Sequence, residues 1–441
     1  MTLVIPDYVQ KALTMLEENG YSAYVVGGAV RDFFLGLQPK DFDVTTNAVP
    51  QQVVELAKKH NYKVIENLGH NFGVVMLVVN GKALEIGTFR GEVYGQDAHR
   101  PEEVVFCQTI EEDLSRRDFT INAMAVDKDS NLIDPYNGLA DLQNKLLRTV
   151  GNAEKRFAED GLRMFRACRF CSRYAFVPDA ELFTAITNQL PRVRGLSMER
   201  VRTELENILV SPYVNTGINM LVTSGLAQES CQMKLAGKVK QIPILPEVAA
   251  VYNSDIIEWS QVTNIIVLVP QDLSLRWAML LYYVAKIENK RTVVQDVLNR
   301  FNYNERFVKR IDWLVGSLDD FIGLKRNKAK VVKDWLRKQA QSRVFTKNNE
   351  LVEAIKQLAE LARVMMIKVN IKEYDSIIKF VEQLPVHTSD LTISGDEVGE
   401  ILTSDRKIGE CMQYLLLQVQ NGNLANKAED LQVAVVAYKN K

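Results

Sequence analysis

Residues 24–45 constrain this chain more than any other stretch, because they combine a glycine pair with two closely spaced aspartates. The apolar residues 23–26 predict a short buried strand, and residues 29–35 predict a short helix. Gly27 and Gly28 lie between them, where a strand end leads into a helix N-terminus. Backbone N–H groups are unpaired there and can donate hydrogen bonds to phosphate oxygens. The stretch therefore predicts a phosphate-binding turn.

Asp41 and Asp43 follow this turn, within residues 40–44. If these residues form a strand, both carboxylates point to one face, because side chains alternate along a strand. Two neighbouring carboxylates repel each other unless a cation lies between them. A phosphate-binding turn beside a carboxylate pair is what metal-assisted phosphoryl transfer requires.

The composition is that of an ordinary globular protein, with 47% hydrophobic and 25% charged residues. At 441 residues the chain is too long for one hydrophobic core, and about two to four domains are expected. The formal net charge is −1, so any basic surface for nucleic acid must be local. No apolar run approaches the roughly 20 residues that span a bilayer, and residues 1–7 lack a signal-peptide pattern, so no membrane partner is expected.

The five cysteines are scattered and odd in number, which predicts reduced thiols and a cytoplasmic protein. Cys168 and Cys171 form a C-x-x-C pair inside a strongly helical segment. We interpret this pair as structural, because no second Cys or His pair stands at zinc spacing. The four histidines are dispersed and give no support for a His-rich metal site.

A β-hairpin is predicted after residue 70, where the hydrophobic period changes from 3.6 to 2. Residues 72–79 and 82–89 are two β-rich runs joined by Asn80 and Gly81, the strongest short hairpin signal. Glu85 stands in the middle of the second run. It is either a solvent-facing edge residue or a third carboxylate that faces the aspartate pair, and the spacing alone leaves both interpretations open.

Residues 91–101 are polar and carry two glycines and a proline, and they predict a loop. Beyond them, Arg116, Arg117 and Asp118 stand next to an apolar helix. Taken alone, such a run is most often a solvated cluster of charges.

From about residue 153 onward the strand signal fades and helices dominate. Residues 153–174 predict a helix on which Asp160, Arg163 and Arg166 line one face, at spacings i, i+3 and i+6. This row is either a surface ladder of salt bridges or a surface that faces a nucleotide.

Two later helices carry further signals. Residues 197–210 predict a helix with Ser197 at its N-cap. Residues 325–343 hold eight Lys or Arg residues and one acid, Asp334, and predict a basic helix. That helix presents either a solvated face or a surface for nucleic-acid phosphates.

Four segments, taken in order and spacing, resemble the class II tRNA nucleotidyltransferases, the family of CCA-adding enzymes and bacterial poly(A) polymerases. A lone Gly-Gly or Asp-x-Asp would be a weak signal, but the four in order are specific. They cover about residues 20–210, and the helical remainder matches only loosely. The segments are Gly27 to Asp32 with Asp41-Phe-Asp43, Arg116 to Asn122, Glu159 to Arg163 with Arg166, and Glu199 to Val201 with Glu204-Leu205.

The resemblance implies an α+β polymerase β-type nucleotidyltransferase head, followed by an all-α neck, body and tail. The head is expected at residues 1–148, a neck that recognises the nucleotide base at 149–212, the body at 213–324, and a tRNA-binding tail at 325–441. The activity that it implies is template-independent addition of CCA to the 3′ end of tRNA from CTP and ATP, by two-metal nucleotidyl transfer with release of pyrophosphate.

The resemblance also implies roles for individual residues. Asp41 and Asp43 become ligands of Mg²⁺, and Glu85 stands where the family's third strand carboxylate lies, so these three are the expected catalytic residues. The expected nucleotide-binding residues are Gly27, Gly28, Arg31, Arg116, Arg117, Asp118, Asn122, Asp160, Arg163 and Arg166.

Hydrogen-bond patterns suggest how a protein could select C and A without a template. Cytosine and adenine both offer an amino donor beside a ring-nitrogen acceptor, whereas uracil and guanine present the reverse. An acceptor such as Asp160 with a donor such as Arg163 would match C and A and leave polar groups unpaired against U and G.

Several alternatives stay open at this point. Within the same family, the protein could add only CC, only A, or a poly(A) tail, because the motifs are shared. From other classes, it could be a non-catalytic tRNA-binding protein, which the paired carboxylates disfavour, or an enzyme that modifies a small molecule, which the long helical half disfavours. The His-Asp phosphohydrolase domain of some bacterial members is lacking, so no phosphatase activity is expected.

Overall fold

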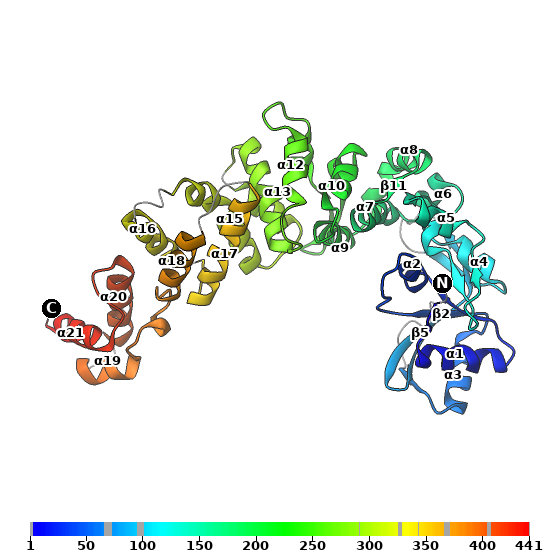
Figure 1. Cartoon of the computed structure of the whole chain (residues 1–441), viewed down its shortest axis with the longest axis horizontal. Helices are drawn as coiled ribbons and strands as arrows, with labels where there is room; N and C mark the ends of the chain where they lie inside the picture. The colour runs from blue at the N-terminus through cyan, green and yellow to red at the C-terminus, as the bar shows by residue number, and fades with distance from the viewer. Residues whose placement is uncertain are drawn as a thin grey trace. The chain divides into compact units, whose positions relative to one another are not determined.

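The computed structural model describes residues 3–65, 73–94, 101–290, 292–324, 329–342, 344–365, 371–403 and 407–440 (Figure 1). The chain forms two compact units, Met1–Ala249 and Ala250–Lys441. The expected boundaries at residues 148, 212 and 324 stay predictions.

A mixed sheet forms the centre of the first unit. Its seven described strands follow the order β3-β4-β5-β2-β1-β8-β9. β1 pairs antiparallel with β2 and with β8, whereas β2 and β5 run parallel. The strands are β1 (Ala23–Val26), β2 (Asp43–Thr46), β3 (Lys63–Ile65), β4 (Val74–Val79), β5 (Lys82–Thr88), β8 (Ala125–Val126) and β9 (Leu132–Ile133).

Helices cover this sheet and continue beyond it. α1 and α3 pack against each other and against the sheet (Figure 1). The helices of the first unit are α1 (Asp7–Glu18), α2 (Gly28–Phe34), α3 (Pro50–Lys59), α4 (Ile110–Ser115), α5 (Gly138–Gln143), α6 (Ala153–Glu159), α7 (Leu162–Tyr174), α8 (Ala180–Gln189), α9 (Met198–Leu209) and α10 (Val214–Thr223). A short parallel ladder joins β10 (Leu146–Leu147) to β11 (Val177–Pro178).

The predicted hairpin is confirmed as β4 and β5. Asn80 (φ 52°) and Gly81 (φ 77°) both take the left-handed conformation, which the tight turn between twisted strands requires. Along the two strands, buried apolar residues alternate with more exposed ones, so one face of the hairpin packs into the core. The buried residues are Val75, Leu77, Val79, Leu84 and Ile86.

The predicted loop at residues 91–101 is wrong at both ends. β6 (Arg90–Tyr94) and β7 (Pro101–Phe106) pair antiparallel there, and residues 95–100 lie outside the described residues. The glycines and polar residues suggested a loop, but the valines at 93, 104 and 105 favour strands. The antiparallel pairing of β6 with β7 also provides hydrogen-bond partners for their backbone groups.

The single helix predicted over residues 153–174 is in fact two helices, α6 and α7. Asp160 is extended (φ −144°, ψ 108°) and ends α6. Its Oδ1 accepts a hydrogen bond from the backbone N–H of Leu162 at 2.9 Å, at the start of α7. An aspartate before a glycine favours such a break, because Asp caps helices better than it continues them.

A second hairpin, β12 (Ser230–Leu235) with β13 (Lys238–Pro243), interrupts the part expected to be all helical. Its turn places Ala236 (φ 50°) and Gly237 (φ 79°) in the left-handed region. Sequence patterns miss it because alanine is not a usual residue for this conformation.

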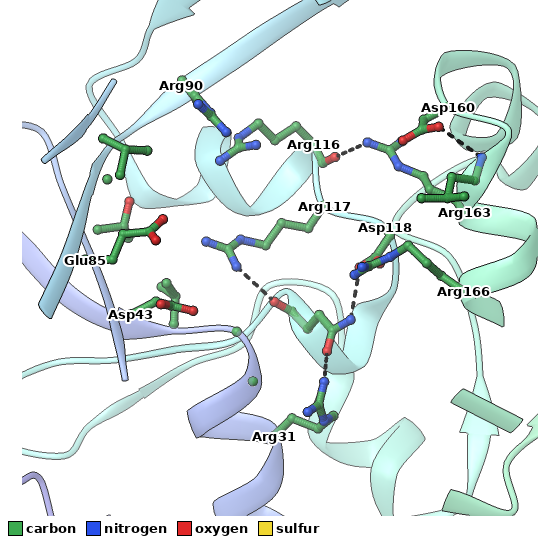
Figure 2. Close-up of a pocket in the computed structure, with 18 of the residues that line it drawn as sticks. Arg31, Asp43, Glu85, Arg90, Arg116, Arg117, Asp118, Asp160, Arg163 and Arg166 are labelled. Atoms are coloured by element: carbon green, nitrogen blue, oxygen red, sulfur yellow. Dashed lines mark hydrogen bonds and ion pairs between the residues drawn. The ribbon is translucent and has the colours of Figure 1, made fainter. Parts of the chain in front are cut away.

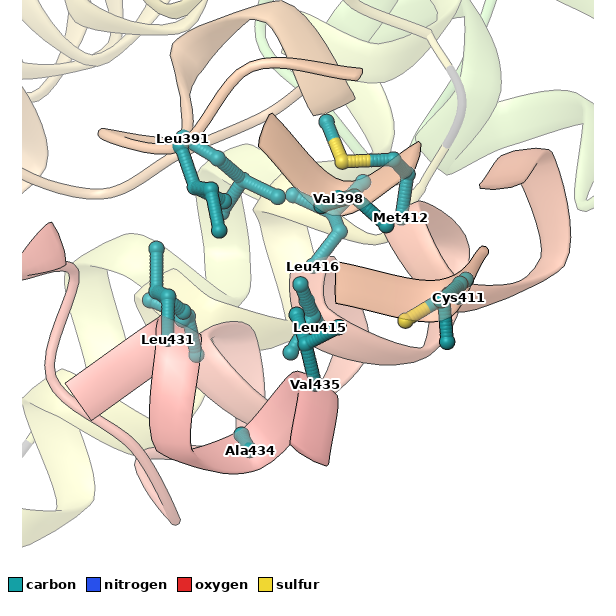
Figure 3. Packing of buried hydrophobic residues seen from close by; sticks show 12 residues of the cluster. Leu391, Val398, Cys411, Met412, Leu415, Leu416, Leu431, Ala434 and Val435 are labelled. Atoms are coloured by element: carbon teal, nitrogen blue, oxygen red, sulfur yellow. The ribbon is translucent and has the colours of Figure 1, made fainter. Parts of the chain in front are cut away.

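The described elements of the second unit are helical. After α11 (Pro246–Tyr252), where the chain passes between the units, they are α12 (Trp259–Ile266), α13 (Leu273–Glu288), α14 (Val293–Arg300), α15 (Glu305–Gly323), α16 (Ala329–Ala340), α17 (Asn348–Val364), α18 (Ile371–Glu382), α19 (Gly395–Leu402), α20 (Ile408–Asn421) and α21 (Ala428–Lys439). The last three enclose an apolar cluster that includes Val398, Leu415 and Leu431 (Figure 3).

The predicted basic helix corresponds to α16, and residues 325–328 and 343 lie outside the described residues. Part of its charge is used in packing. Lys333 and Arg337 lie over the ring of Phe380, with the cations 5.3 and 5.8 Å from its centre, and Arg337 also pairs with Asp334 at 3.1 Å. Lys330 and Lys338 are exposed.

Gly217 allows α10 to pack closely against α7, and we predict that Gly217→Ala destabilises the protein. An added Cβ would lie 2.6 Å from the Cβ of Ser172 and 2.9 Å from the carbonyl oxygen of Cys168. Overpacking of this kind lowers the free energy of unfolding by about 1–3 kcal/mol. Gly316→Ala, in α15, is the control: its Cβ meets no atom within 4 Å, and it should raise helix stability by up to about 1 kcal/mol. Urea unfolding of both variants measures the difference, and equal effects would contradict the prediction.

Candidate functional site

A cavity of about 700 Å³ opens in the first unit and gathers most of the residues expected from the sequence (Figure 2). Its wall comes from the β1–α2 turn, from β2 and β5, from the segment after α4, and from α7 and α9. The charged residues that line it are Arg31, Asp43, Glu85, Arg90, Arg116, Arg117, Asp118, Asp160, Arg163, Arg166, Arg169 and Arg200.

The glycine pair forms one side of the cavity. Gly27 is the N-cap of α2 and has φ +69°, a conformation that L-residues with a side chain rarely adopt. A Cβ at Gly27 would approach the Nη1 of Arg117 to 3.1 Å. The absent side chain therefore keeps open the space between the turn and this arginine.

Two carboxylates stand side by side on the sheet. The parallel register of β2 and β5 pairs Asp43 with Glu85, so both side chains project from the same face toward the cavity. Glu85 is not an edge residue, because β5 lies between β4 and β2; its side chain is exposed and faces Asp43.

The surroundings disfavour negative charge on this pair. Loss of hydration raises the pKa of Asp43; Arg117 lowers that pKa and Asp41 raises it. Loss of hydration also raises the pKa of Glu85, and the neighbouring Asp43 raises it further. A carboxylate pair that repels itself in this way is stabilised by a bound cation.

The strand considered over residues 40–44 is shorter in the structure. β2 begins at Asp43, so Asp41 lies in the preceding segment, is exposed, and is not among the described residues that line the cavity. The physical reason is the end of the neighbouring strand: β1 stops at Val26, opposite Asp43, and the chain then turns at Gly27. Within the described residues, no group of three or more acidic, histidine or cysteine side chains is arranged to hold a metal ion.

Arg116 and Arg117 are not a solvated run of charges. Their side chains are 20% and 19% exposed, and both pair with Asp113, whose side chain is fully buried. Figure 2 shows the guanidinium group of Arg117 opposite Glu85 and Asp43, and that of Arg116 beside Arg90. The Nε of Arg117 is buried and has no hydrogen-bond partner within the described part of the chain.

Asp118 and Asn122 belong to a buried network that reaches from α2 to α7. Asp118 accepts from Arg166 Nε at 2.7 Å and from Asn122 Nδ2 at 3.0 Å, and Arg31 Nη1 donates to Asn122 Oδ1 at 2.6 Å. Burial alone would raise the pKa of Asp118, but Arg166 and Asn122 hold that pKa well below its usual range. Asp118 therefore stays ionised.

Arg31 lines the cavity as predicted, but its guanidinium group already contacts other side chains of the protein. It pairs with Asp32 at 2.7 Å, and its guanidinium lies over the rings of Phe170 and Tyr174, 5.3 and 5.1 Å from their centres. The Tyr174 hydroxyl donates to Asp32 Oδ1 at 2.9 Å. These contacts attach α2 to α7.

Asp160 and Arg163 both line the cavity, but they do not form one helical face. Arg163 Nη1 pairs with Glu159 at 2.7 Å, and its Nη2 donates to the carbonyl oxygen of Arg116 at 3.1 Å. Asp160 Oδ2 pairs with Arg200 Nη2 at 3.0 Å. The i, i+3, i+6 argument fails for Asp160 because this residue lies in the break between α6 and α7.

Three further arginines line the cavity but are not among the nucleotide-binding residues expected from the sequence: Arg90, Arg200 and Arg169, the last of which follows Arg163 and Arg166 in the arginine row that could face a nucleotide. Arg200 stands in the Glu-Arg-Val segment that carried part of the resemblance, and that segment was the available signal. No local pattern distinguishes Arg90, which begins β6.

Cys168 and Cys171 are fully buried free thiols, in agreement with a structural pair. Burial raises the pKa of Cys171 to about 12 and that of Cys168 well above its ordinary value. Neither forms a thiolate near neutral pH.

Among the described residues, no helix is long and apolar enough to cross a membrane.

Two family models match the chain. The "Poly A polymerase head domain" matches residues 23–148, and the "Probable RNA and SrmB-binding site of polymerase A" matches residues 175–230. The first match contains the sheet with its carboxylates, and the second contains α9 and its Arg200.

Known proteins resemble the chain over different lengths. The CCA-adding enzyme of Streptococcus mutans serotype c is 30% identical over 439 residues, which cover 96% of each chain. The CCA-adding enzyme of Geobacillus stearothermophilus is 41% identical over 232 residues, which span 52% of this chain and only 55% of that enzyme.

Solved structures are similar along the whole chain. The crystal structure of the Bacillus stearothermophilus CCA-adding enzyme in complex with CTP is 25% identical, with a TM-score of 0.71, and the match covers 99% of this chain and 98% of that one. Because this similarity and the Streptococcus relative both extend over nearly the full length, the chain belongs to the family of CCA-adding enzymes, which are tRNA nucleotidyltransferases.

Proposed function

We propose that this protein adds C and A nucleotides to the 3′ end of tRNA, using CTP and ATP, without a nucleic-acid template and with release of pyrophosphate. One observation carries the proposal: Asp43 and Glu85 face Arg116 and Arg117 across a cavity of about 700 Å³. Carboxylates on one side hold cations, and arginines on the other bind phosphates, so the cavity suits a nucleoside triphosphate with its metal.

The family's reaction uses a divalent metal ion, and we propose that this ion is Mg²⁺. Mg²⁺ commonly binds through one or two carboxylates together with substrate phosphates, which fits the pair Asp43 and Glu85. Asp41 is proposed as a further ligand because its charge acts on Asp43. The bound metal would lower the pKa of the attacking 3′-hydroxyl and neutralise charge on the phosphates.

The chain's own groups would orient the triphosphate. Gly27, Gly28, Arg116 and Arg117 line the cavity, and we propose that the two backbone N–H groups and the two guanidinium groups donate to phosphate oxygens. Arg31, Asp118, Asn122 and Arg166 form the network behind them, which holds the cavity wall in place and, we propose, meets the ribose.

Base selection is assigned to Asp160 and Arg163. Asp160 supplies the acceptor and Arg163 the donors that cytosine and adenine both match. Arg200, paired with Asp160, would orient that carboxylate. A uracil or guanine would leave these groups unpaired, at a cost of about 1–3 kcal/mol for each group.

CC-only, A-only and poly(A) addition use the same cavity chemistry, so they remain the alternatives within the family. A tRNA-binding protein without activity is the alternative from another class. We also propose a cytoplasmic location, which the five free thiols support.

Product length separates these alternatives directly. With tRNA that lacks its 3′ CCA, we expect two added residues with CTP alone, none with ATP alone, and three with both nucleotides, because A addition needs the preceding CC end. A sequencing gel reads the lengths. Long tails with ATP alone would assign poly(A) synthesis, and a single A added only to a second substrate, tRNA that already ends in CC, would assign A addition. No extension of either tRNA under any condition would refute the catalytic proposal.

Replacement of the paired carboxylate should abolish this extension. Asp43→Asn removes the charge that holds the metal, and the loss of several kcal/mol of transition-state stabilisation lowers the rate by about 1,000-fold or more. Asp127→Asn, at an exposed turn where Asp127 accepts backbone hydrogen bonds, is the control. Single-turnover rates are compared, and Asp43→Asn at the wild-type rate would exclude a metal ligand at this position.

The same assay tests whether Asp41 is a metal ligand. If Asp41 is a ligand as proposed, Asp41→Asn reduces the rate about as strongly as Asp43→Asn does. A near-normal rate would restrict the ligands to the two carboxylates on β2 and β5.

Removal of the donor at position 163 should affect both rate and base choice. We expect Arg163→Ala to lower CTP and ATP incorporation by about 10- to 100-fold and to reduce discrimination against UTP. Arg202→Ala removes an arginine that pairs with Glu206 on α9 and serves as the control. The kcat/KM values for CTP, ATP and UTP provide the measurement. An unchanged preference in folded Arg163→Ala would rule out this role.

A further inference from the structure

Asp113 is a buried carboxylate to which no role has been assigned so far. It lies on α4, is 0% exposed, and is not among the described residues that line the cavity. A fully buried acid needs charged or hydrogen-bonding partners, because a bare carboxylate is costly to remove from water. The hydrogen-bond partners of Asp113 therefore indicate its role in the structure.

Each oxygen of Asp113 holds a different arginine. Oδ1 accepts from Arg116 Nε at 3.1 Å and Nη2 at 2.9 Å, and Oδ2 accepts from Arg117 Nη2 at 3.0 Å. Oδ1 also accepts from the backbone N–H of Arg90 at 3.3 Å. All three arginines line the cavity, so one carboxylate behind the wall connects three residues at its surface.

The spacing along the chain makes this arrangement possible. Arg116 and Arg117 follow Asp113 by three and four residues, which places their side chains one helical turn away. α4 itself is held by a capping box, in which Thr109 accepts from the N–H of Glu112 and Glu112 accepts from the N–H of Thr109. The position of Asp113 is therefore determined before any ligand binds.

Stability alone does not account for such a cluster. Burial raises the pKa of Asp113, but Arg116 and Arg117 lower it more, so the carboxylate is ionised at neutral pH. Buried ion pairs contribute little net stability compared with apolar residues of the same volume. What the pairing does provide is a defined direction for two long, flexible side chains.

We propose that Asp113 is a positioning residue for nucleotide transfer: it presents Arg116 and Arg117 to the phosphates of the nucleoside triphosphate, opposite Asp43 and Glu85. This inference rests on the function proposed above. Asp113 does not touch the substrate; its bonds to the two arginines reduce the conformational freedom that phosphate binding would otherwise have to remove.

The test compares three variants by steady-state kinetics and by direct titration with CTP. Asp113→Asn keeps the size of the side chain and removes its charge, and we expect the KM for CTP and ATP to rise about ten-fold or more. Asp113→Glu restores the charge one methylene further out, and its KM should lie between those of the wild type and Asp113→Asn. Binding of tRNA should not change.

The matched control is Asp179→Asn. Asp179 caps α8 by accepting from the N–H of Leu182 at 2.7 Å, pairs with Arg148 at 3.2 Å, and is not among the described residues that line the cavity. Its loss affects a more exposed ion pair that does not involve the cavity arginines, so the KM should stay within about two-fold of the wild type.

A double-mutant cycle distinguishes positioning from a purely structural role. In an Arg116→Gln/Arg117→Gln background, Asp113→Asn should change the KM by less than about two-fold, because the side chains through which it acts are gone. The same ten-fold effect in that background would overturn the proposal, as would a folded Asp113→Asn protein with the wild-type KM. If Asp113→Asn does not fold, Asp113→Glu provides the test: a raised KM supports the proposal, and the wild-type KM refutes it.

Extension of tRNA and binding of CTP, measured separately, distinguish a wrong reaction from a wrong role for Asp113. If the wild type extends no tRNA but binds CTP, the proposed reaction is wrong, and weaker CTP binding by Asp113→Asn still supports the positioning role. Equal CTP binding by the two proteins would refute it.

Discussion

The pairing of β2 with β5 is the interaction on which the candidate site depends. These strands are not neighbours in the chain, and their parallel register alone brings Asp43 beside Glu85. The two carboxylates repel each other and lose part of their hydration, so the pair is unfavourable without a cation. The sheet therefore presents a negative pair whose charge a bound cation and the arginines that line the cavity would balance.

Buried acids organise those arginines. Asp113 directs Arg116 and Arg117 from behind the wall, and Asp118 holds Arg166. Asp160, at the break between α6 and α7, is paired with Arg200. In each case an acid that is not fully solvated limits the freedom of a guanidinium group, so the cavity presents fixed donors. This preorganisation is what a protein needs to recognise phosphates and a base without a nucleic-acid template.

Much of the head was predictable from local patterns. The strand before Gly27, the short helix after it and the hairpin at Asn80–Gly81 all occur as expected, because turn chemistry and hydrophobic period act over a few residues. The errors arose where local signals were ambiguous. Asp160 ends a helix instead of continuing it, residues 91–94 form a strand despite their polarity, and the β12–β13 hairpin turns on an alanine.

The sequence by itself determined which local helices and strands form and which charged residues are available. Its motifs also indicated the reaction class through their resemblance to a known family. All of these depend on residue type and short spacing. Only the tertiary structure decided which charges meet. Glu85 faces Asp43, Arg200 pairs with Asp160, and Asp41 is not among the described residues that line the cavity. The physical reason is that such contacts join residues about 40 positions apart, and strand order and helix packing set them rather than any property of the neighbouring residues.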